Sequence, residues 1–120
     1  MLSEAVAKSQ IDFFRKSWVA DYPDEENFLS LFYSKNWTPK GFNYSHYSNT
    51  RFDLLYEQAQ EELNDSIRYS YYQEMDNILM EDIPIIPIYY DQVVRLVQNN
   101  VSGLTSNPMN MLDLKRVKLN

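Results

Sequence analysis

The sequence predicts an α/β or α+β fold in which helices pack on a small mixed sheet. Residues 50–63 and 65–83 carry apolar side chains at helical spacing, which predicts two consecutive helices. Residues 83–90 are apolar at every position, as is typical of a strand buried on both faces. Residues 112–119 alternate apolar and polar side chains, which is typical of a half-exposed strand.

The composition is that of a folded chain. Its 120 residues allow one compact domain at most, and 44% hydrophobic and 15% aromatic residues are too many for a disordered acidic tail. The net charge is −6 and the Lys and Arg residues are scattered, which argues against nucleic acid and favours cationic or amine-bearing ligands. The absence of Cys excludes disulfides, Cys-ligated zinc and thiol catalysis. It does not indicate in which cellular compartment the protein is found.

Neither a membrane span nor a signal peptide is expected in these residues. The longest uncharged apolar run, Ile83–Tyr90, is far shorter than the roughly 20 residues that cross a bilayer. The first six residues lack a basic region followed by an apolar segment.

The elements before the helical pair are shorter. Leu2–Lys8 is expected to end a helix, and residues 11–19 are rich in aromatic and branched side chains, which predicts a strand. Asp21–Asp24 ends that strand. Asp24 is a suitable N-cap for a short helix over residues 25–33, and residues 34–50 are expected to form a long, functional loop.

The later elements follow from their boundary residues. Asn49 or Thr50 is the expected cap of the first helix of the pair and Asp65 that of the second, which Pro84 ends. Residues 93–97 continue as a strand. The last 30 residues have no helix to cover them, so the sheet lacks strands and the chain is expected to be a piece of a larger protein.

Aromatic residues divide into expected core and open cases. Ordinary core packing is expected for five of them: Phe13, Phe14, Phe28, Phe32 and Phe52. Five others could form either an aromatic wall around a ligand or part of the core: Trp18, Tyr22, Trp37, Tyr44 and Tyr47.

Asp21 is the strongest candidate binding residue. It follows an apolar strand, where a carboxylate is expected to be partly desolvated and needs a cation or several donors. A ligand ammonium would satisfy it, and so would a structural partner such as Arg15 or Lys16. Both alternatives remain open on the residues alone.

Catalysis, metal binding and a cofactor are not expected. Asp21 and Asp24 lie too close in sequence to face each other across a cleft as paired carboxylates would. His46 has no second His and no acidic neighbour at ligand spacing. Tyr89 and Tyr90 end a buried strand, so either could face a cleft or form a core hydrogen bond.

Three segments carry a resemblance to a known family. Residues 18–29, Trp-Val-Ala-Asp-Tyr-Pro-Asp-Glu-Glu-Asn-Phe-Leu, resemble a motif of the family 5 extracellular solute-binding proteins, the peptide, dipeptide and nickel receptors of ABC importers. Residues 44–56 are similar to that family's Tyr-containing loop and following helix, and residues 83–97 to its late Pro-rich strand. The motifs occur in the family's order and cover nearly the whole chain.

The resemblance implies a fold and a division of the chain. Family members have two lobes that close on ligand, and this chain looks like the C-terminal portion of such a fold. Residues 1–90 would complete the second ligand-binding lobe, and residues 91–120 would form a crossover and return to the first lobe. The strands missing from the sheet would then belong to the absent N-terminal portion.

The resemblance also implies site residues. Asp21 matches the aspartate that anchors the α-ammonium group of a peptide, and the backbone of Ser17 and Val19 would pair with the peptide as an added strand. Trp18 and Tyr22 would shape the space for side chains. Tyr90 or the neighbouring Asp91 would lie near ligand at the lobe crossover.

The implied function is capture of an oligopeptide or dipeptide outside the cytoplasmic membrane and its delivery to the membrane subunits of an ABC importer. No bond is made or broken, and no cofactor or nucleic acid takes part. The receptor would be periplasmic or extracytoplasmic, anchored by the missing N-terminal region if it is a lipoprotein. The alternative is a stand-alone protein-interaction domain that uses the aromatic loop and an open sheet edge.

Overall fold

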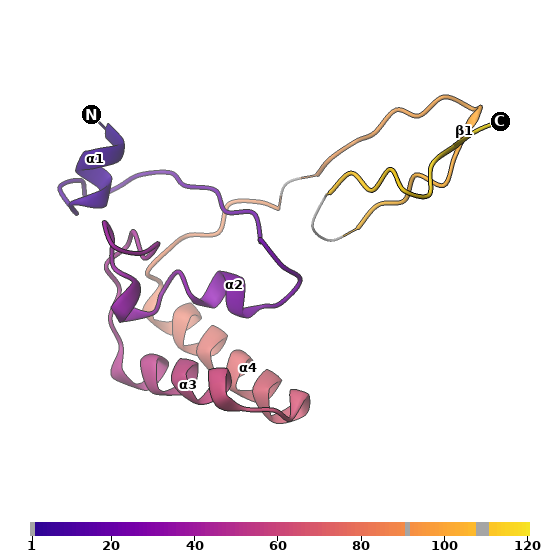
Figure 1. Ribbon diagram of the computed structural model, residues 1–120. Helices are drawn as coiled ribbons and strands as arrows, with labels where there is room; N and C mark the ends of the chain where they lie inside the picture. The colour runs from indigo at the N-terminus through magenta and orange to yellow at the C-terminus, as the bar shows by residue number, and fades with distance from the viewer. Residues whose placement is uncertain (1, 91, 108–110) are drawn as a thin grey trace.

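The computed structural model describes residues 2–90, 92–107 and 111–120, and it is mostly helical (Figure 1). Four α-helices and a short 3-10 helix precede a two-stranded antiparallel sheet. Their bounds are α1 Leu2–Ala7, α2 Glu26–Leu29, η1 Ser34–Asn36, α3 Thr50–Glu61, α4 Asp65–Asp82, β1 Val101–Ser102 and β2 Lys118–Leu119.

Helices α3 and α4 form the expected hairpin, and each begins at an asparagine cap. The side chain of Asn49 accepts hydrogen bonds from the backbone of Arg51 and Phe52 at the start of α3. Asn64 does the same for α4, so the cap lies one residue before the predicted Asp65. These bonds satisfy backbone donors that the first turn of a helix leaves unpaired.

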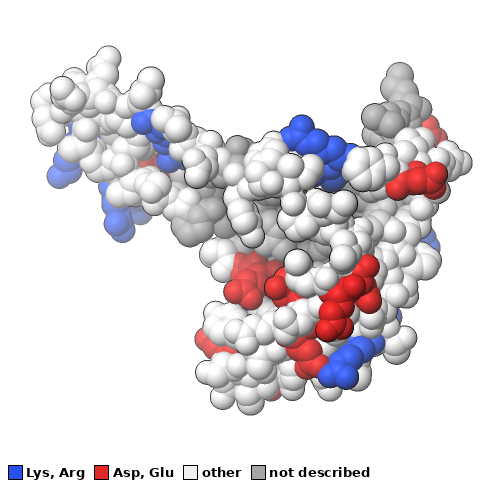
Figure 2. Space-filling model, turned by 180° about the vertical axis from the view of Figure 1, so that it is seen from behind, with Lys and Arg blue, Asp and Glu red and all other residues white. Residues whose placement is uncertain are grey.

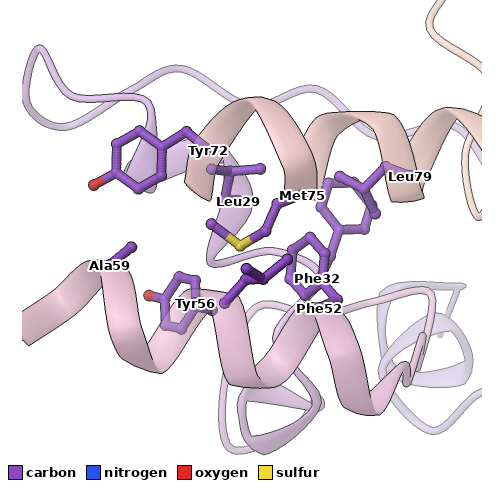
Figure 3. Packing of buried hydrophobic residues seen from close by; sticks show 9 residues of the cluster. Leu29, Phe32, Phe52, Tyr56, Ala59, Tyr72, Met75 and Leu79 are labelled. Carbon is purple, nitrogen blue, oxygen red and sulfur yellow. The ribbon is translucent and has the colours of Figure 1, made fainter. Parts of the chain in front are cut away.

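The core lies between the hairpin and α2 (Figure 3). Phe52 and Met75 are fully buried, one from each helix of the hairpin. Phe32 confirms its predicted core position at 7% exposed. The full cluster consists of Leu29, Phe32, Phe52, Leu55, Tyr56, Ala59, Tyr72, Met75 and Leu79.

Two predicted core residues lie on the surface instead. Phe13 is 83% exposed and Phe28 is 47% exposed. Phe13 lies in a segment without regular secondary structure, and α2 is a single turn that buries Leu29 rather than Phe28. The predicted helix over residues 25–33 therefore ends early, at Leu29, and continues only as turns.

The predicted mixed sheet does not form among the described residues. Residues 11–19, 83–90 and 93–97 belong to no strand, and only Lys118–Leu119 of the last predicted strand is paired. In the one sheet of the described chain, Val101 lies opposite Leu119 and Ser102 opposite Lys118. Strand pairing needs a partner segment, and these apolar segments have none here.

The C-terminal residues project from the helical part as a long hairpin, called the arm below and comprising residues 92–107 and 111–120 (Figure 1). The radius of gyration of the chain is 18.2 Å. A compact domain of this length would have about 13–14 Å. No helix among the described residues is both long and apolar enough to cross a membrane.

Candidate functional site

The candidate site begins with a stretch of extended, unpaired backbone. Residues 13–20 have no regular secondary structure, and no described residue forms a hydrogen bond to their backbone groups. Ser17 is exposed and Val19 is 69% exposed, so these groups face solvent. An exposed row of free N–H and C=O groups is the feature that an added peptide strand pairs with.

Asp21 follows directly, and its side chain is exposed rather than partly desolvated as predicted. Asp21 begins the bend at residues 21–24 that precedes α2. Within the described residues it has no ion pair and no side-chain hydrogen bond.

The two cations that were candidates to neutralise Asp21 have other partners. Arg15 donates a hydrogen bond to the hydroxyl of Tyr89, and its guanidinium lies 5.6 Å from the centre of that ring. The ammonium of Lys16 lies 3.9 Å from the ring centre of Tyr44. Among the described residues, therefore, neither Arg15 nor Lys16 pairs with Asp21, and the role of Asp21 in ligand binding stays a prediction.

Trp18 is half-buried and held on two sides. Its indole N–H donates to Oδ1 of Asn27 at 2.8 Å, and its ring centre lies 5.2 Å from that of Phe42. Asn27 is only 4% exposed. Trp18 is thus fixed in orientation, with part of its ring exposed beside the extended segment.

The aromatic residues of the loop have two kinds of contact. Phe42 packs beside Trp18 and Tyr44 beside Lys16, whereas Trp37 and Tyr47 make contacts within the loop. Trp37 stacks on His46 with ring centres 5.2 Å apart, and its indole N–H donates to the carbonyl of Tyr47 at 2.9 Å. The Tyr47 hydroxyl donates to Asp82 at 2.5 Å. These contacts stabilise the loop itself, so an aromatic wall that includes Trp37 and Tyr47 is not what the structure shows.

The Tyr22 side chain is held by a hydrogen bond to Glu26. One carboxylate oxygen of Glu26 accepts a hydrogen bond from Tyr22 and the other from Tyr56 of α3. The bond to Glu26 is the main cause that raises the pKa of Tyr22 above its usual value, whereas burial is the main cause for Tyr56. Both hydroxyls therefore stay protonated and act as donors.

Asp24 ties the same turn to α4. One of its carboxylate oxygens lies 3.4 Å from the guanidinium of Arg68, and Asp24 also contributes to the raised pKa of Tyr72, for which burial is the main cause. The other oxygen accepts from the backbone N–H of Glu26 at 2.9 Å. The N-cap of α2 is Glu25, one residue after the predicted Asp24. A hollow of about 280 Å³ lies next to this turn. It is lined by Tyr22, Asp24, Glu26, Arg68 and Tyr72 together with Ala59 and Gln60.

The end of the apolar 83–90 segment lies beside the 13–20 segment, because Arg15 contacts Tyr89. Tyr90 is 98% exposed, and Asp91 lies outside the described residues. The exposed Tyr90 ring does not make the core hydrogen bond that was one alternative for this pair.

Sequence reasoning missed the supporting residues of the site, namely Glu26, Asn27 and Arg68. Glu26 lies four residues after Tyr22, which is the spacing for a side-chain contact within one helical turn. Arg68 comes from α4, and no local pattern predicts a contact 44 residues away. His46 contacts Thr38 at 3.0 Å, and no metal-binding cluster occurs in the part of the chain that the structure describes.

No protein-family model matches the chain. Curated proteins do. The dipeptide-binding protein DppE of Bacillus subtilis (strain 168) is 30% identical over 106 residues, 88% of this chain and 19% of its own length. The periplasmic murein peptide-binding protein MppA of Escherichia coli (strain K12) is 36% identical over 96 residues, 80% of this chain and 17% of its own.

A third relative is named for a different ligand. The probable deoxycholate-binding periplasmic protein YgiS of Escherichia coli (strain K12) is 33% identical over 89 residues, 74% of this chain and 16% of its own length. The relatives are thus solute-binding proteins, named for binding rather than for catalysis.

Over most of its length the chain is a distant homologue of the family 5 extracellular solute-binding proteins, as the three motif segments indicated. It spans about a fifth of the length of the curated relatives it matches.

Proposed function

We propose that the chain is the C-terminal portion of an extracytoplasmic receptor that captures peptides and delivers them to an ABC importer. Residues 1–90 would complete the second ligand-binding lobe, and residues 91–120 would form the crossover and the return to the first lobe. The homology to peptide-binding proteins supports this assignment. Two relatives carry "periplasmic" in their names, which supports a location outside the cytoplasmic membrane, with a lipoprotein anchor upstream if one exists.

The proposed recognition uses one side chain and one stretch of backbone. The Asp21 carboxylate binds the α-ammonium group of the peptide through a charge-assisted hydrogen bond. The backbone groups of Ser17 and Val19 pair with the peptide main chain as an added strand. Trp18, Tyr22 and Tyr90 bound the space for the ligand side chains.

The observation that carries this proposal is the free Asp21 carboxylate at the end of unpaired extended backbone. A carboxylate without an ion pair among the described residues keeps its full attraction for an incoming cation. The neighbouring N–H and C=O groups are likewise free to pair. One arrangement therefore offers both the charge and the strand edge that a peptide with a free amino terminus requires.

Isothermal titration of the complete receptor that contains this chain tests the role of Asp21. Asp21→Asn should weaken binding of a peptide with a free amino terminus by about tenfold to a hundredfold, the usual worth of a hydrogen bond to a charged group. The matched control is Asp12→Asn, which removes another exposed carboxylate from the same stretch of chain. Equal affinity of the Asp21→Asn and Asp12→Asn receptors would contradict the proposal.

A second candidate function is a stand-alone protein-interaction domain. The observation that favours it is the row of exposed apolar side chains beyond α4, which includes Ile86 at 69% and Leu96 at 97% exposed. Gel filtration separates the two candidates. A stable, well-folded monomer would favour a stand-alone domain, whereas self-association of the chain would favour a severed lobe.

A further inference from the structure

Asn27 is the buried polar residue closest in sequence to the candidate binding segment, and its side chain serves that segment. It lies on α2 and is 4% exposed. Its Oδ1 accepts the indole N–H of Trp18 at 2.8 Å. A buried amide is retained where its hydrogen bonds are made, and removing its partner leaves a desolvated group.

The neighbouring residue of α2 holds Tyr22. Glu26 accepts a hydrogen bond from the Tyr22 hydroxyl and is itself fixed to α3 through Tyr56. Asn27 and Glu26, adjacent on α2, therefore hold Trp18 and Tyr22, the residues three positions before and one position after Asp21.

Asp21 itself has no side-chain partner among the described residues that would fix its place. Its position therefore depends on how the backbone on either side is held. Trp18 is held by Asn27 and Phe42, and Tyr22 by Glu26. Of these supporting residues, Asn27 is the buried one.

We infer that Asn27 is a positioning residue that holds Trp18, and so sets where the Asp21 carboxylate meets the charged amino terminus of a peptide. The inference rests on the proposed function, because it concerns the same site. It predicts that Asn27 controls selectivity for a charged amino terminus, not merely the stability of the fold.

The experiment measures a ratio of two affinities. The complete receptor is titrated with one peptide in free and in N-acetylated form, and the ratio of the two dissociation constants is compared between variants. Unfolded molecules bind neither peptide, so a loss of stability lowers both affinities alike and leaves the ratio unchanged. The ratio of the two dissociation constants therefore changes when the position of Asp21 changes, and does not change when only the stability of the fold is reduced.

Asn27→Ser is the main variant, because Ser is polar but too short to reach the indole. It is expected to reduce the preference for the free over the N-acetylated peptide by at least about fivefold. This is a large part of the preference that one charge-assisted hydrogen bond provides. Asn77→Ser, at an exposed position of α4, is the matched control and should leave the ratio unchanged. Asn27→Asp keeps an acceptor for Trp18 and should retain more of the preference than Asn27→Ser.

The outcomes separate the two proposals. A ratio near one in the unsubstituted receptor overturns both the ammonium role of Asp21 and this inference. A clear preference that Asn27→Ser leaves intact overturns the inference alone. If Asn27→Ser yields no folded receptor, an unchanged ratio in Trp18→Phe, which loses the indole N–H that donates to Asn27, overturns it as well.

Discussion

Asp82 shows how single polar residues fix the loop that precedes the hairpin. It lies in the last turn of α4, where a carboxylate opposes the helix dipole. Two donors offset this cost: the Tyr47 hydroxyl at 2.5 Å and the Asn49 amide at 2.9 Å. These hydrogen bonds lower the pKa of Asp82 below its ordinary value of 3.8, with Tyr47 the larger cause.

Stability should therefore decline in acid. A carboxyl whose pKa is lower in the folded state stabilises the fold above its ordinary pKa of 3.8, and this contribution is lost as the pH falls through the folded value. Urea unfolding at pH 6 and pH 3 measures the decline. Asp82→Asn should make it smaller.

The control for this measurement is Asp12→Asn, which removes an exposed carboxylate from the extended segment. It should leave the difference between the two pH values as in the unsubstituted chain. A pH dependence that Asp82→Asn does not reduce would show that the two hydrogen bonds to Asp82 contribute nothing.

At the scale of elements, the helices were predictable because their signals are local. Apolar spacing, an Asn cap and a terminating proline placed α3 and α4 within a few residues of their bounds. The strands were not predictable as strands. Ile83–Tyr90 has the composition of a buried strand, yet it stays extended and exposed because strand pairing depends on a partner segment.

The site was predictable only in part for the same reason. The motif marked Trp18, Asp21 and Tyr22, and the structure leaves the Asp21 carboxylate free as a ligand would require. The motif could not indicate that Arg15 contacts Tyr89 or that Arg68 contacts Asp24, because those contacts join segments far apart in the sequence.

The two Asn caps should contribute differently to the free energy of unfolding. Asn49→Ala removes a cap bonded to two backbone N–H groups and also a donor to Asp82, so it should lower the free energy of unfolding by about 1–2 kcal/mol. Asn64→Ala removes a weaker cap, with one of its bonds at 3.4 Å, and should cost about 0.5–1 kcal/mol. Urea unfolding measures both.

Asn77→Ala is the control for the caps, since Asn77 is exposed in the interior of α4. It should change the free energy of unfolding by less than about 0.5 kcal/mol. Equal losses for Asn49→Ala and Asn77→Ala would contradict the capping role.

At the scale of the whole molecule, charge and apolar surface are unevenly divided. Residues 1–90 contain fifteen Asp and Glu against seven Lys and Arg, whereas residues 92–120 contain one against four. Figure 2 shows acidic side chains gathered on the helical part and basic ones on the arm. Apolar residues such as Val94 and Leu96 are 82% and 97% exposed there.

This exposed apolar surface should bind a hydrophobic dye. The triple substitution Ile86→Ser, Val94→Ser and Leu96→Ser should reduce dye fluorescence by more than half without lowering the urea midpoint of the helical part, because these side chains lie outside its core. Leu63→Ser, at a position 96% exposed between the two hairpin helices, is the control and should change the signal little. Unchanged fluorescence in the triple variant would contradict an exposed apolar arm.

The proposed peptide capture depends on the pairing of the Asp21 carboxylate with the ammonium group of the peptide. A titration of two receptors with two peptides measures that pairing. The complete receptor and its Asp21→Asn variant are each titrated with the free and the N-acetylated form of one peptide. The expected result is a preference for the free peptide of about tenfold or more that Asp21→Asn abolishes, since charge and partner are then both required. A preference of the same size in both receptors would contradict the account.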